Sequence, residues 1–407
     1  MSITPRENIL RLLKGEPPEW VPFVPEMISW FQFYKNSGTL PKEIAHCRSI
    51  QEVFTTMEWD SFMKQAGTFP DIDNETGEIL NGPVTGHGGS HFVRIEYTGD
   101  LDVTCTDKSE NECQVCMSTI RNGNEVQIHT PHGDLELGYA WKRESATTFE
   151  QGWLWRDFDT QYQAVKYFCE NEHFHFDTDA YLKAEKEAGD TGIPMVLITQ
   201  TPLKLMHLLA GPENGFLFIL DHEPEILELM ELHTEKTLVY LREALEAGAL
   251  VFNSMDNLNT QFFPPDFIDK YCREHFRRCA ELIHEKDGFL WCHACGQISE
   301  IVDNVKDCNI DGLEGVAHPP LGDMTLSESL KAFGDGFTIA GGMTCYEEEV
   351  QGNAKEFIDD YVKKTFDSLR PREFRGFIFG SACCVMPPTP WDNIRYFFDA
   401  CRKYGRN

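Results

Sequence analysis

The second half of the chain alternates short apolar runs with longer segments in which apolar positions recur every three or four residues. A short continuous apolar run is typical of a strand buried on both faces, whereas the longer period is typical of an amphipathic helix. We interpret these runs as strands: 194–199, 250–255, 289–293, 310–314, 338–342 and 376–380. Their alternation with helical segments predicts consecutive βα units around a parallel sheet.

The N-terminal segment supplies the rest of this pattern. Residues 4–7 read Thr-Pro-Arg-Glu, which is the order of a helix N-terminus, and Gly15 ends the apolar face that follows. Apolar runs at 20–25 and 59–64 are candidates for the first two strands. Together with the six later runs they give the eight strands of an α/β fold of the (β/α)8 TIM barrel class.

Residues 68–155 follow a different pattern, with Gly and Asn between short segments of alternating polarity. Alternation with period two predicts strands that are buried on one face. Asn122-Gly123 is typical of a hairpin turn, because both positions tolerate positive φ. We therefore expect a single barrel domain over 1–407, with an antiparallel β-rich insertion at 68–155 covering the barrel mouth. The alternating segments are 91–97, 114–120 and 126–129.

The charge balance limits the partners that the chain can have. It contains 36 Lys and Arg against 66 Asp and Glu, for a formal net charge of −30. Such a field disfavours nucleic acid and anionic membranes, and it fits a neutral or cationic substrate or a docking protein. We see no signal peptide and no apolar run long enough for a membrane span, so we expect a cytoplasmic protein. Its 14 cysteines are then expected to be buried thiols or metal ligands.

The candidate chemistry lies where predicted strands end. His293 and Cys295 close the run 289–293, and i and i+2 positions of a strand point to the same side. Cys383 follows the run 376–380, and a barrel brings the C-terminal ends of its strands to one mouth. Zinc binds such nitrogen and sulfur donors. The alternative for His293, Cys295 and Cys383 is a buried thiol pair with a hydrogen-bonded histidine. Cys292 should point away from Cys295, because neighbouring residues of a strand face opposite sides, so we expect it in the core.

Three carboxylates also fall at strand ends. Glu314 is a candidate fourth ligand or general acid, while Glu26 and Asp256 are candidates for contact with the site or for capping and packing. Cys113-x-x-Cys116 has the spacing of a metal or redox pair, but no second pair at zinc-finger spacing accompanies it. We therefore interpret that pair as structural.

Several of these motifs occur together in a known family. His293-Ala294-Cys295-Gly296 has the form His-x-Cys-Gly, and a later cysteine precedes Thr-Pro-x-x-Asn at 389–393. With the opening segment 5–8, Val21-Pro22 and Gly341-Gly342, most of the chain resembles the uroporphyrinogen decarboxylase-like superfamily. It is most similar to the zinc-dependent, corrinoid-linked methyltransferase branch, which includes methylcobamide:coenzyme M and O-demethylase types. The spacing to 389–393 favours Cys383 over Cys384, and the insertion is not part of the minimal family pattern.

One segment argues against the decarboxylase activity of that superfamily. True uroporphyrinogen decarboxylases have Met-Arg-Gln-Ala-Gly-Arg after the first strand, and its arginines bind substrate carboxylates. This chain has Pro-Glu-Met-Ile-Ser-Trp at 25–30. An acidic mouth without arginine would repel a polycarboxylate, so charge disfavours decarboxylation.

The resemblance implies a zinc enzyme that moves a methyl group from a small methylated substrate to the cobalt of a corrinoid. No Asp-x-His-x-x-Gly segment is present to hold cobalamin, so we expect the corrinoid on a partner protein. We favour a methoxylated aromatic substrate because the insertion can wall an aromatic pocket. The alternatives are methyl transfer to a thiol, as with coenzyme M, or to tetrahydrofolate. A decarboxylase and a non-catalytic protein stabilised by zinc are less favoured. Each of these functions is compatible with a homodimer.

Overall fold

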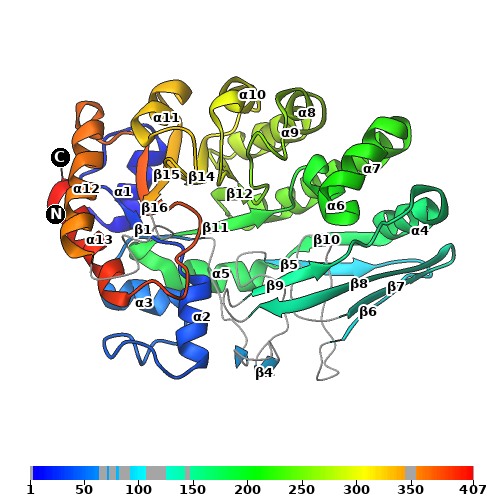
Figure 1. Ribbon diagram of the computed structural model, residues 1–407, viewed down its shortest axis with the longest axis horizontal. Helices are drawn as coiled ribbons and strands as arrows, with labels where there is room; N and C mark the ends of the chain where they lie inside the picture. The colour runs from blue at the N-terminus through cyan, green and yellow to red at the C-terminus, as the bar shows by residue number, and fades with distance from the viewer. Residues whose placement is uncertain are drawn as a thin grey trace.

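The computed structural model describes residues 3–63, 71–72, 79–81, 92–106, 125–142, 147–343 and 354–406. Its centre is a sheet of eight parallel strands in the order β1-β16-β15-β14-β13-β12-β11-β2, surrounded by helices (Figure 1). The predicted TIM barrel class is therefore confirmed. The strands are β1 (Phe23–Val24), β2 (Ser61–Met63), β11 (Gly192–Ile198), β12 (Val251–Ser254), β13 (Phe289–His293), β14 (Gly312–Val316), β15 (Thr338–Met343) and β16 (Phe377–Ser381).

Helices follow the strands along the chain, and local signals in the sequence account for several of their ends. At α1, the Thr4 side chain accepts a hydrogen bond from Glu7 N, and the Glu7 side chain accepts one from Thr4 N. The sequence did not predict α2. The helices are α1 (Pro5–Leu13), α2 (Ile28–Asn36), α3 (Ile50–Met57), α4 (Phe158–Asn171), α5 (Thr178–Ala188), α6 (Pro202–Asp221), α7 (Glu223–Glu246), α8 (Pro265–Phe267), α9 (Arg273–His284), α10 (Val302–Asp307), α11 (Leu326–Phe333), α12 (Lys355–Leu369) and α13 (Trp391–Tyr404).

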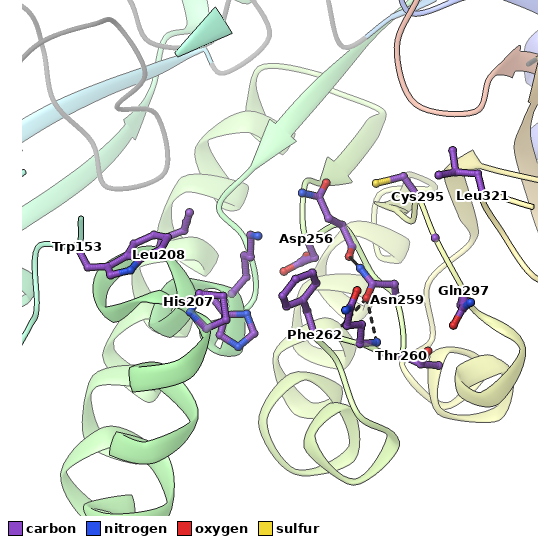
Figure 2. A pocket seen from close by; sticks show the side chains of 15 residues that line it. Trp153, His207, Leu208, Asp256, Asn259, Thr260, Phe262, Cys295, Gln297 and Leu321 are labelled. Atoms are coloured by element: carbon purple, nitrogen blue, oxygen red, sulfur yellow. Dashed lines mark hydrogen bonds between the residues drawn. The ribbon is translucent and has the colours of Figure 1, made fainter. Parts of the chain in front are cut away.

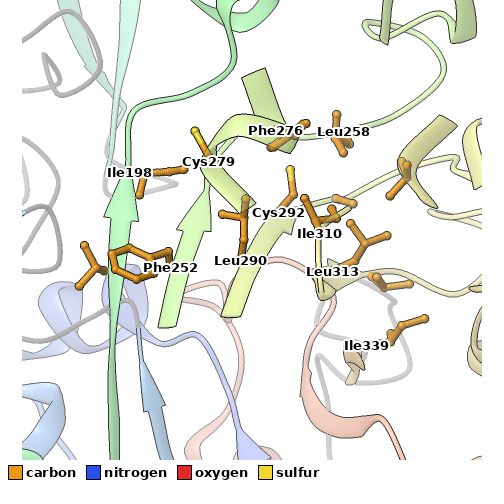
Figure 3. Close-up of a cluster of buried hydrophobic side chains, with 14 of the residues drawn as sticks. Ile198, Phe252, Leu258, Phe276, Cys279, Leu290, Cys292, Ile310, Leu313 and Ile339 are labelled. Atoms are coloured by element: carbon orange, nitrogen blue, oxygen red, sulfur yellow. The ribbon is translucent and has the colours of Figure 1, made fainter. Parts of the chain in front are cut away.

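The barrel core has two layers because neighbouring residues of a strand face opposite sides. On β13, Trp291 packs inside the barrel with Ile193, Val251 and side chains of α1. Cys292 packs instead in the outer layer between strands and helices (Figure 3). The prediction that Cys292 is a core residue is confirmed, and the next residue, His293, returns to the inner side.

A buried carboxylate joins the two end strands of the sheet. Asp60 directly precedes β2, and its two oxygens accept hydrogen bonds from Trp20 Nε1 at 2.8 Å and from Phe23 N of β1 at 3.0 Å. Burial raises the pKa of Asp60, while Arg402, at 3.6 Å, lowers it. β1 is shorter than the predicted run 20–25 because Pro22 and Pro25 carry no N–H for a ladder.

The segment inserted after β2 is rich in antiparallel strands, as predicted. A four-stranded sheet has the order β6-β7-β8-β9, and β5 pairs with β10. β5 lies within 68–155, whereas its partner β10 lies beyond residue 155. The segment 114–120, the turn at 122–123 and the Cys113/Cys116 pair lie outside the described residues. The strands are β3 (Asp71–Ile72), β4 (Ile79–Asn81), β5 (Val93–Tyr97), β6 (Asp102–Thr106), β7 (Glu125–Thr130), β8 (Gly133–Lys142), β9 (Thr147–Gln151) and β10 (Glu172–Phe176).

Within the part of the chain that the structure describes, no helix combines the length and apolarity needed to cross a membrane.

Replacing Asp60 tests whether this carboxylate holds the ends of the barrel together. Asp60→Ala leaves buried donors on Trp20 and Phe23 without an acceptor, so we expect the free energy of unfolding to fall by about 2–5 kcal/mol. Asp335→Ala is the control, because the Asp335 side chain is 99% exposed and pairs with Arg372 on the surface. It should change stability by about 0.5 kcal/mol or less. Urea denaturation measures both, and equal effects would contradict the role given to Asp60.

Candidate functional site

Three side chains that are distant in the sequence meet at the C-terminal ends of the barrel strands. His293 is the last residue of β13, Cys295 follows it, and Cys383 lies two residues beyond β16. Their ligand atoms all lie within 4.8 Å of one another. β14 and β15 separate β13 from β16 in the sheet, so the curvature of the barrel brings these residues together. The structure thus gathers the three residues that the sequence singled out as metal ligands.

Glu314 fixes the orientation of the histidine. It is the register partner of His293 on the neighbouring strand β14. Its Oε2 lies 2.6 Å from His293 Nδ1, and both side chains are largely buried. A carboxylate accepts, so Nδ1 carries the proton and Nε2 is the nitrogen with a lone pair. Nε2 lies 3.9 Å from Cys383 Sγ, on the side of the sulfur donors.

A glycine next to Glu314 makes this contact possible. Gly315 has φ +84°, and a Cβ there would lie 2.5 Å from His293 Cε1. The register between β14 and β15 also shifts between Glu314 and Val316. Only a residue without a side chain fits this backbone and leaves room for the imidazole. Gly315 is therefore part of the construction of the site.

The loop that carries Cys383 is held by the end of β1. Glu26 N donates to Ser381 Oγ at 2.9 Å, and Ser381 Oγ donates to the carbonyl of Cys383 at 3.0 Å. Val385 N in turn donates to the carbonyl of Glu26 at 2.7 Å. These three hydrogen bonds fix the backbone on both sides of the cysteine.

The surroundings of Cys383 favour its ionised form. Hydrogen bonds from Cys295 and Cys384, with a smaller contribution from His293, hold the pKa of the Cys383 thiol well below its usual range. Cys383 is thus predisposed to be a thiolate, which is the form that binds metals.

The donor set fits zinc. One imidazole nitrogen and two sulfurs lie together, and the second nitrogen of the imidazole is already bonded to a carboxylate. Zinc binds histidine and cysteine in this way, and catalytic zinc sites use three protein ligands with one further position for substrate. Cys384 is not one of the three residues that gather their ligand atoms; its thiol hydrogen-bonds to Cys383, and its Sγ lies 3.7 Å from Met386 Sδ. This arrangement agrees with the choice of Cys383 from the sequence.

A cavity of about 740 Å³ opens beside these residues and is lined in part by Cys295. Figure 2 shows Cys295 and Leu321 on one side, Trp153, Leu208 and His207 on the other, and Asp256, Asn259 and Phe262 between them. Sequence reasoning did not single out Trp153, Lys204 or His207. The available signal was position, because Lys204 and His207 lie in the first turns of the helix after β11, where barrel enzymes place site residues.

The end of the insertion forms one wall of this cavity. Helix α6 is kinked at Gly211, which has φ +80° and precedes Pro212. A Cβ at Gly211 would lie 2.5 Å from the indole of Trp153, so the indole packs directly on the kink. Trp155 N also donates to the carbonyl of Leu209 at 2.8 Å. The kink therefore seats Trp153 at the cavity.

The other two predicted carboxylates lie outside the three-residue cluster. Asp256 lines the cavity, but it is fully buried and its Oδ1 accepts hydrogen bonds from Thr201 N at 2.9 Å and Thr201 Oγ1 at 2.5 Å. Burial raises the pKa of Asp256, and hydrogen bonds from Ser254 and Thr201 lower it. Glu26 Oε1 accepts from Ile28 N at 2.9 Å at the start of α2. Both carboxylates therefore accept hydrogen bonds from nearby backbone N–H groups, Asp256 from Thr201 and Glu26 from Ile28.

Comparison with known proteins identifies the family of the chain. Residues 154–404 match the model of the uroporphyrinogen decarboxylase (URO-D) family. The match covers more than half of the 407 residues, so the chain belongs to this family, as its motifs predicted. Strands β3 to β9 of the insertion lie before the matched segment in the chain.

The proteins to which the chain is similar include two methyltransferases. The methylcobamide:CoM methyltransferase MtaA of Methanosarcina barkeri is 20% identical over 231 residues, which cover 55% of this chain and 62% of that protein. The chain thus matches less than two thirds of the length of this relative. The structure of a methyltransferase from Methanosarcina mazei aligns with this chain at a TM-score of 0.59 and 13% sequence identity. The alignment covers 99% of each chain. The second likeness is one of fold.

Replacing Cys383 and Cys384 by serine, one at a time, tests which of them is the metal ligand. We expect the purified protein to hold about one zinc per chain and Cys383→Ser to lose it, because serine removes a soft donor from the cluster. Cys384→Ser is the matched control and should keep the metal. Metal analysis by mass spectrometry measures both variants. Zinc lost from the Cys384 variant and retained in the Cys383 variant would show that the ligand is the other cysteine.

Proposed function

We propose that this chain is a zinc-dependent methyltransferase that moves a methyl group from a small methylated substrate to the cobalt of a corrinoid carried by a partner protein. The observation that carries the proposal is the His293, Cys295 and Cys383 cluster beside a cavity that also contains Cys295 in its wall. A metal held there would meet a small molecule in the cavity. The relative named a methylcobamide:CoM methyltransferase supports the corrinoid as the methyl carrier.

We favour a methoxylated aromatic as the substrate. Trp153 and Phe262 line the cavity and offer flat apolar surfaces, with Leu208 and Leu321 beside them. Aromatic side chains of this kind pack against a ring and exclude water from it. We propose that the rest of the insertion also covers the mouth, which the position of Trp153 supports.

In demethylation of an aryl methyl ether, the bond between oxygen and the methyl carbon breaks, and the oxygen leaves with the electron pair. Bound zinc would supply a Lewis acid that stabilises the negative charge on that oxygen. We propose that Glu314, protonated on Oε1 while Oε2 accepts from His293 Nδ1, delivers the proton to this oxygen, with Glu26 as the second candidate. Its contact with His293 gives Glu314 a positioning role as well, because it holds the histidine with Nε2 on the side of the sulfurs.

The lining of the cavity argues against a polycarboxylate substrate. Among the described residues that form its wall there is one lysine, Lys204, and no arginine. Several carboxylates would need more cationic partners than this wall offers. The decarboxylase alternative is therefore disfavoured by the cavity as well as by the sequence at 25–30.

Methyl transfer to a thiol is the second candidate function. Two sulfur donors place more negative charge on a metal than nitrogen donors do, which suits the binding of a thiolate better than the activation of an ether. The relative whose name includes CoM also favours this alternative. In that case no acid is needed, since a thiolate accepts the methyl group directly.

Glu314→Gln separates the two functions. Glutamine keeps an oxygen that can accept from His293 Nδ1, so zinc and fold should be retained, but it cannot deliver a proton. We expect transfer from a methoxyaromatic to cob(I)alamin to slow by about 10²–10⁴-fold. The absorbance change of the corrinoid measures the rate. Glu300→Gln is the control, because Glu300 is an exposed carboxylate in the short helix Ser299–Ile301 that follows β13.

The pattern of results identifies the role of Glu314. Loss of zinc in the Gln variant would make Glu314 a ligand or an indispensable support of His293 rather than the acid. Wild-type protein that ignores aryl ethers but methylates thiols from methylcobalamin would contradict demethylation and support the second candidate.

A further inference from the structure

Asn257 lies in the wall of the cavity, in the loop that follows β12. It lines the same cavity as Cys295 and is partly exposed, whereas the preceding Asp256 is fully buried. Figure 2 shows Asp256 and Asn259, which flank it in the chain, between Cys295 and the wall that carries Trp153. A ligand that lies against Cys295 therefore meets this loop.

The backbone of Asn257 is left-handed and is held in place on both sides. Its φ is +57°, in a region that few residues other than glycine adopt and that asparagine tolerates better than most. Asn259 Nδ2 donates to the carbonyl of Asn257 at 2.8 Å, and Leu258 N donates to the carbonyl of His293 at 2.9 Å. On the other side, the buried Asp256 is tied by hydrogen bonds to the start of α6. Strained backbone that its surroundings hold in place is frequent at functional sites.

The carboxamide of Asn257 is available to a ligand. Among the residues that the structure describes, its side chain makes no hydrogen bond to the protein. By contrast, the carboxamide of Asn259 in the same loop is engaged at both atoms. Its Oδ1 accepts from Gln261 N at 3.0 Å and Phe262 N at 3.1 Å, and its Nδ2 donates to Asn257. Because Asn257 is partly exposed and lines the cavity, a bound molecule can supply a partner for its amide.

A carboxamide at this position suits an oxygen on which negative charge develops. Its Nδ2 provides two N–H donors and carries no charge. In the proposed demethylation the bond from oxygen to the methyl carbon breaks, and the methyl carbon bonds instead to an electron pair of the cobalt. The oxygen keeps the former bonding pair until it is protonated. A fixed donor that faces such an oxygen stabilises this charge without the cost of reorientation, and the contacts around Asn257 fix its backbone in that way.

We propose that Asn257 is a catalytic residue that donates a hydrogen bond from Nδ2 to the substrate oxygen that loses its methyl group. This proposal rests on the proposed function, because methylation of a thiol releases no such oxygen. Asn257 would share this oxygen with a metal held by His293, Cys295 and Cys383. Glu314 remains the proposed source of the proton, and the amide keeps its own protons.

Replacing Asn257 by glycine removes the carboxamide and keeps a residue that adopts the left-handed backbone without strain. We expect methyl transfer from a methoxyaromatic to cob(I)alamin to slow by about 10²–10³-fold, the range for removal of one such donor. Asn257→Asp, which keeps the shape but has no N–H donor when ionised, should slow transfer at least as much. The matched control is Asn309→Gly. Asn309 also has a left-handed backbone, with φ +61°, but it is exposed and lies before β14, outside the cavity wall.

Binding of 4-nitrophenol to the zinc-containing protein, without the corrinoid protein, tests the contact separately. The ionised form of this phenol absorbs visible light and has the phenolate oxygen that demethylation would leave. We expect the wild type to lower the pKa of the bound phenol, because the donor stabilises the phenolate. Asn257→Gly should raise that pKa again by about 1–2 pH units, the range of one hydrogen bond to a charged acceptor. Asn309→Gly should bind the phenol as the wild type does, and the zinc content of every variant is measured alongside.

Other outcomes would overturn the proposal. No binding of the phenol to the wild type, a phenol pKa unchanged in Asn257→Gly, or a loss of rate that Asn309→Gly shares would each exclude Asn257 as the donor. Loss of zinc from Asn257→Gly would make the loop a support of His293 instead. An active wild type whose rate is unchanged in Asn257→Gly would refute the role of Asn257 and leave the proposed function standing. The expected phenol binding beside a wild type that transfers no methyl group would refute the proposed function and leave Asn257 as the residue that binds the oxygen.

Discussion

The closure of parallel strands into a barrel is the constraint on which the site depends. His293 and Cys383 are 90 residues apart, yet His293 Nε2 and Cys383 Sγ lie 3.9 Å from each other, because the strands that carry them end at the same mouth. The inner position of His293 follows from the alternation that puts Trp291 inside the barrel and Cys292 outside it. Packing of the core and placement of the cluster are therefore two results of one strand register.

Buried carboxylates connect strands and helices at places where the backbone hydrogen bonds of the sheet do not connect them. Asp60 joins β1 to the start of β2, Asp256 joins the end of β12 to α6, and Glu314 joins β14 to His293. Each accepts hydrogen bonds in a place where an unpaired donor would be costly. These contacts tie the residues of the His293, Cys295 and Cys383 cluster and of the cavity wall to the ends of the barrel strands, and such fixed geometry is what the proposed methyl transfer would need.

The sequence predicted the features that arise from repeating patterns and from motifs. Apolar runs located the strands of the barrel, and the positions of His293, Cys295 and Cys383 at strand ends predicted their convergence. It did not predict the cavity residues Trp153 and His207. The indole of Trp153 packs on the kink of α6 at Gly211, and His207 is packed by Phe216 beyond that kink and by Phe263 from another segment. β10 was missed because its partner β5 is distant in the chain, a pairing without local signal.

X-ray absorption at the zinc edge of the purified protein tests the central claim most directly, because it reports the donors around the metal without reference to any substrate. We expect two sulfur donors at about 2.3 Å and nitrogen at about 2.0–2.1 Å, with a lighter atom or substrate in the remaining position. Addition of a substrate that binds the metal should change only that remaining position. A protein without stoichiometric zinc, or a shell of oxygen and nitrogen alone, would contradict the assignment of His293, Cys295 and Cys383 as the metal centre.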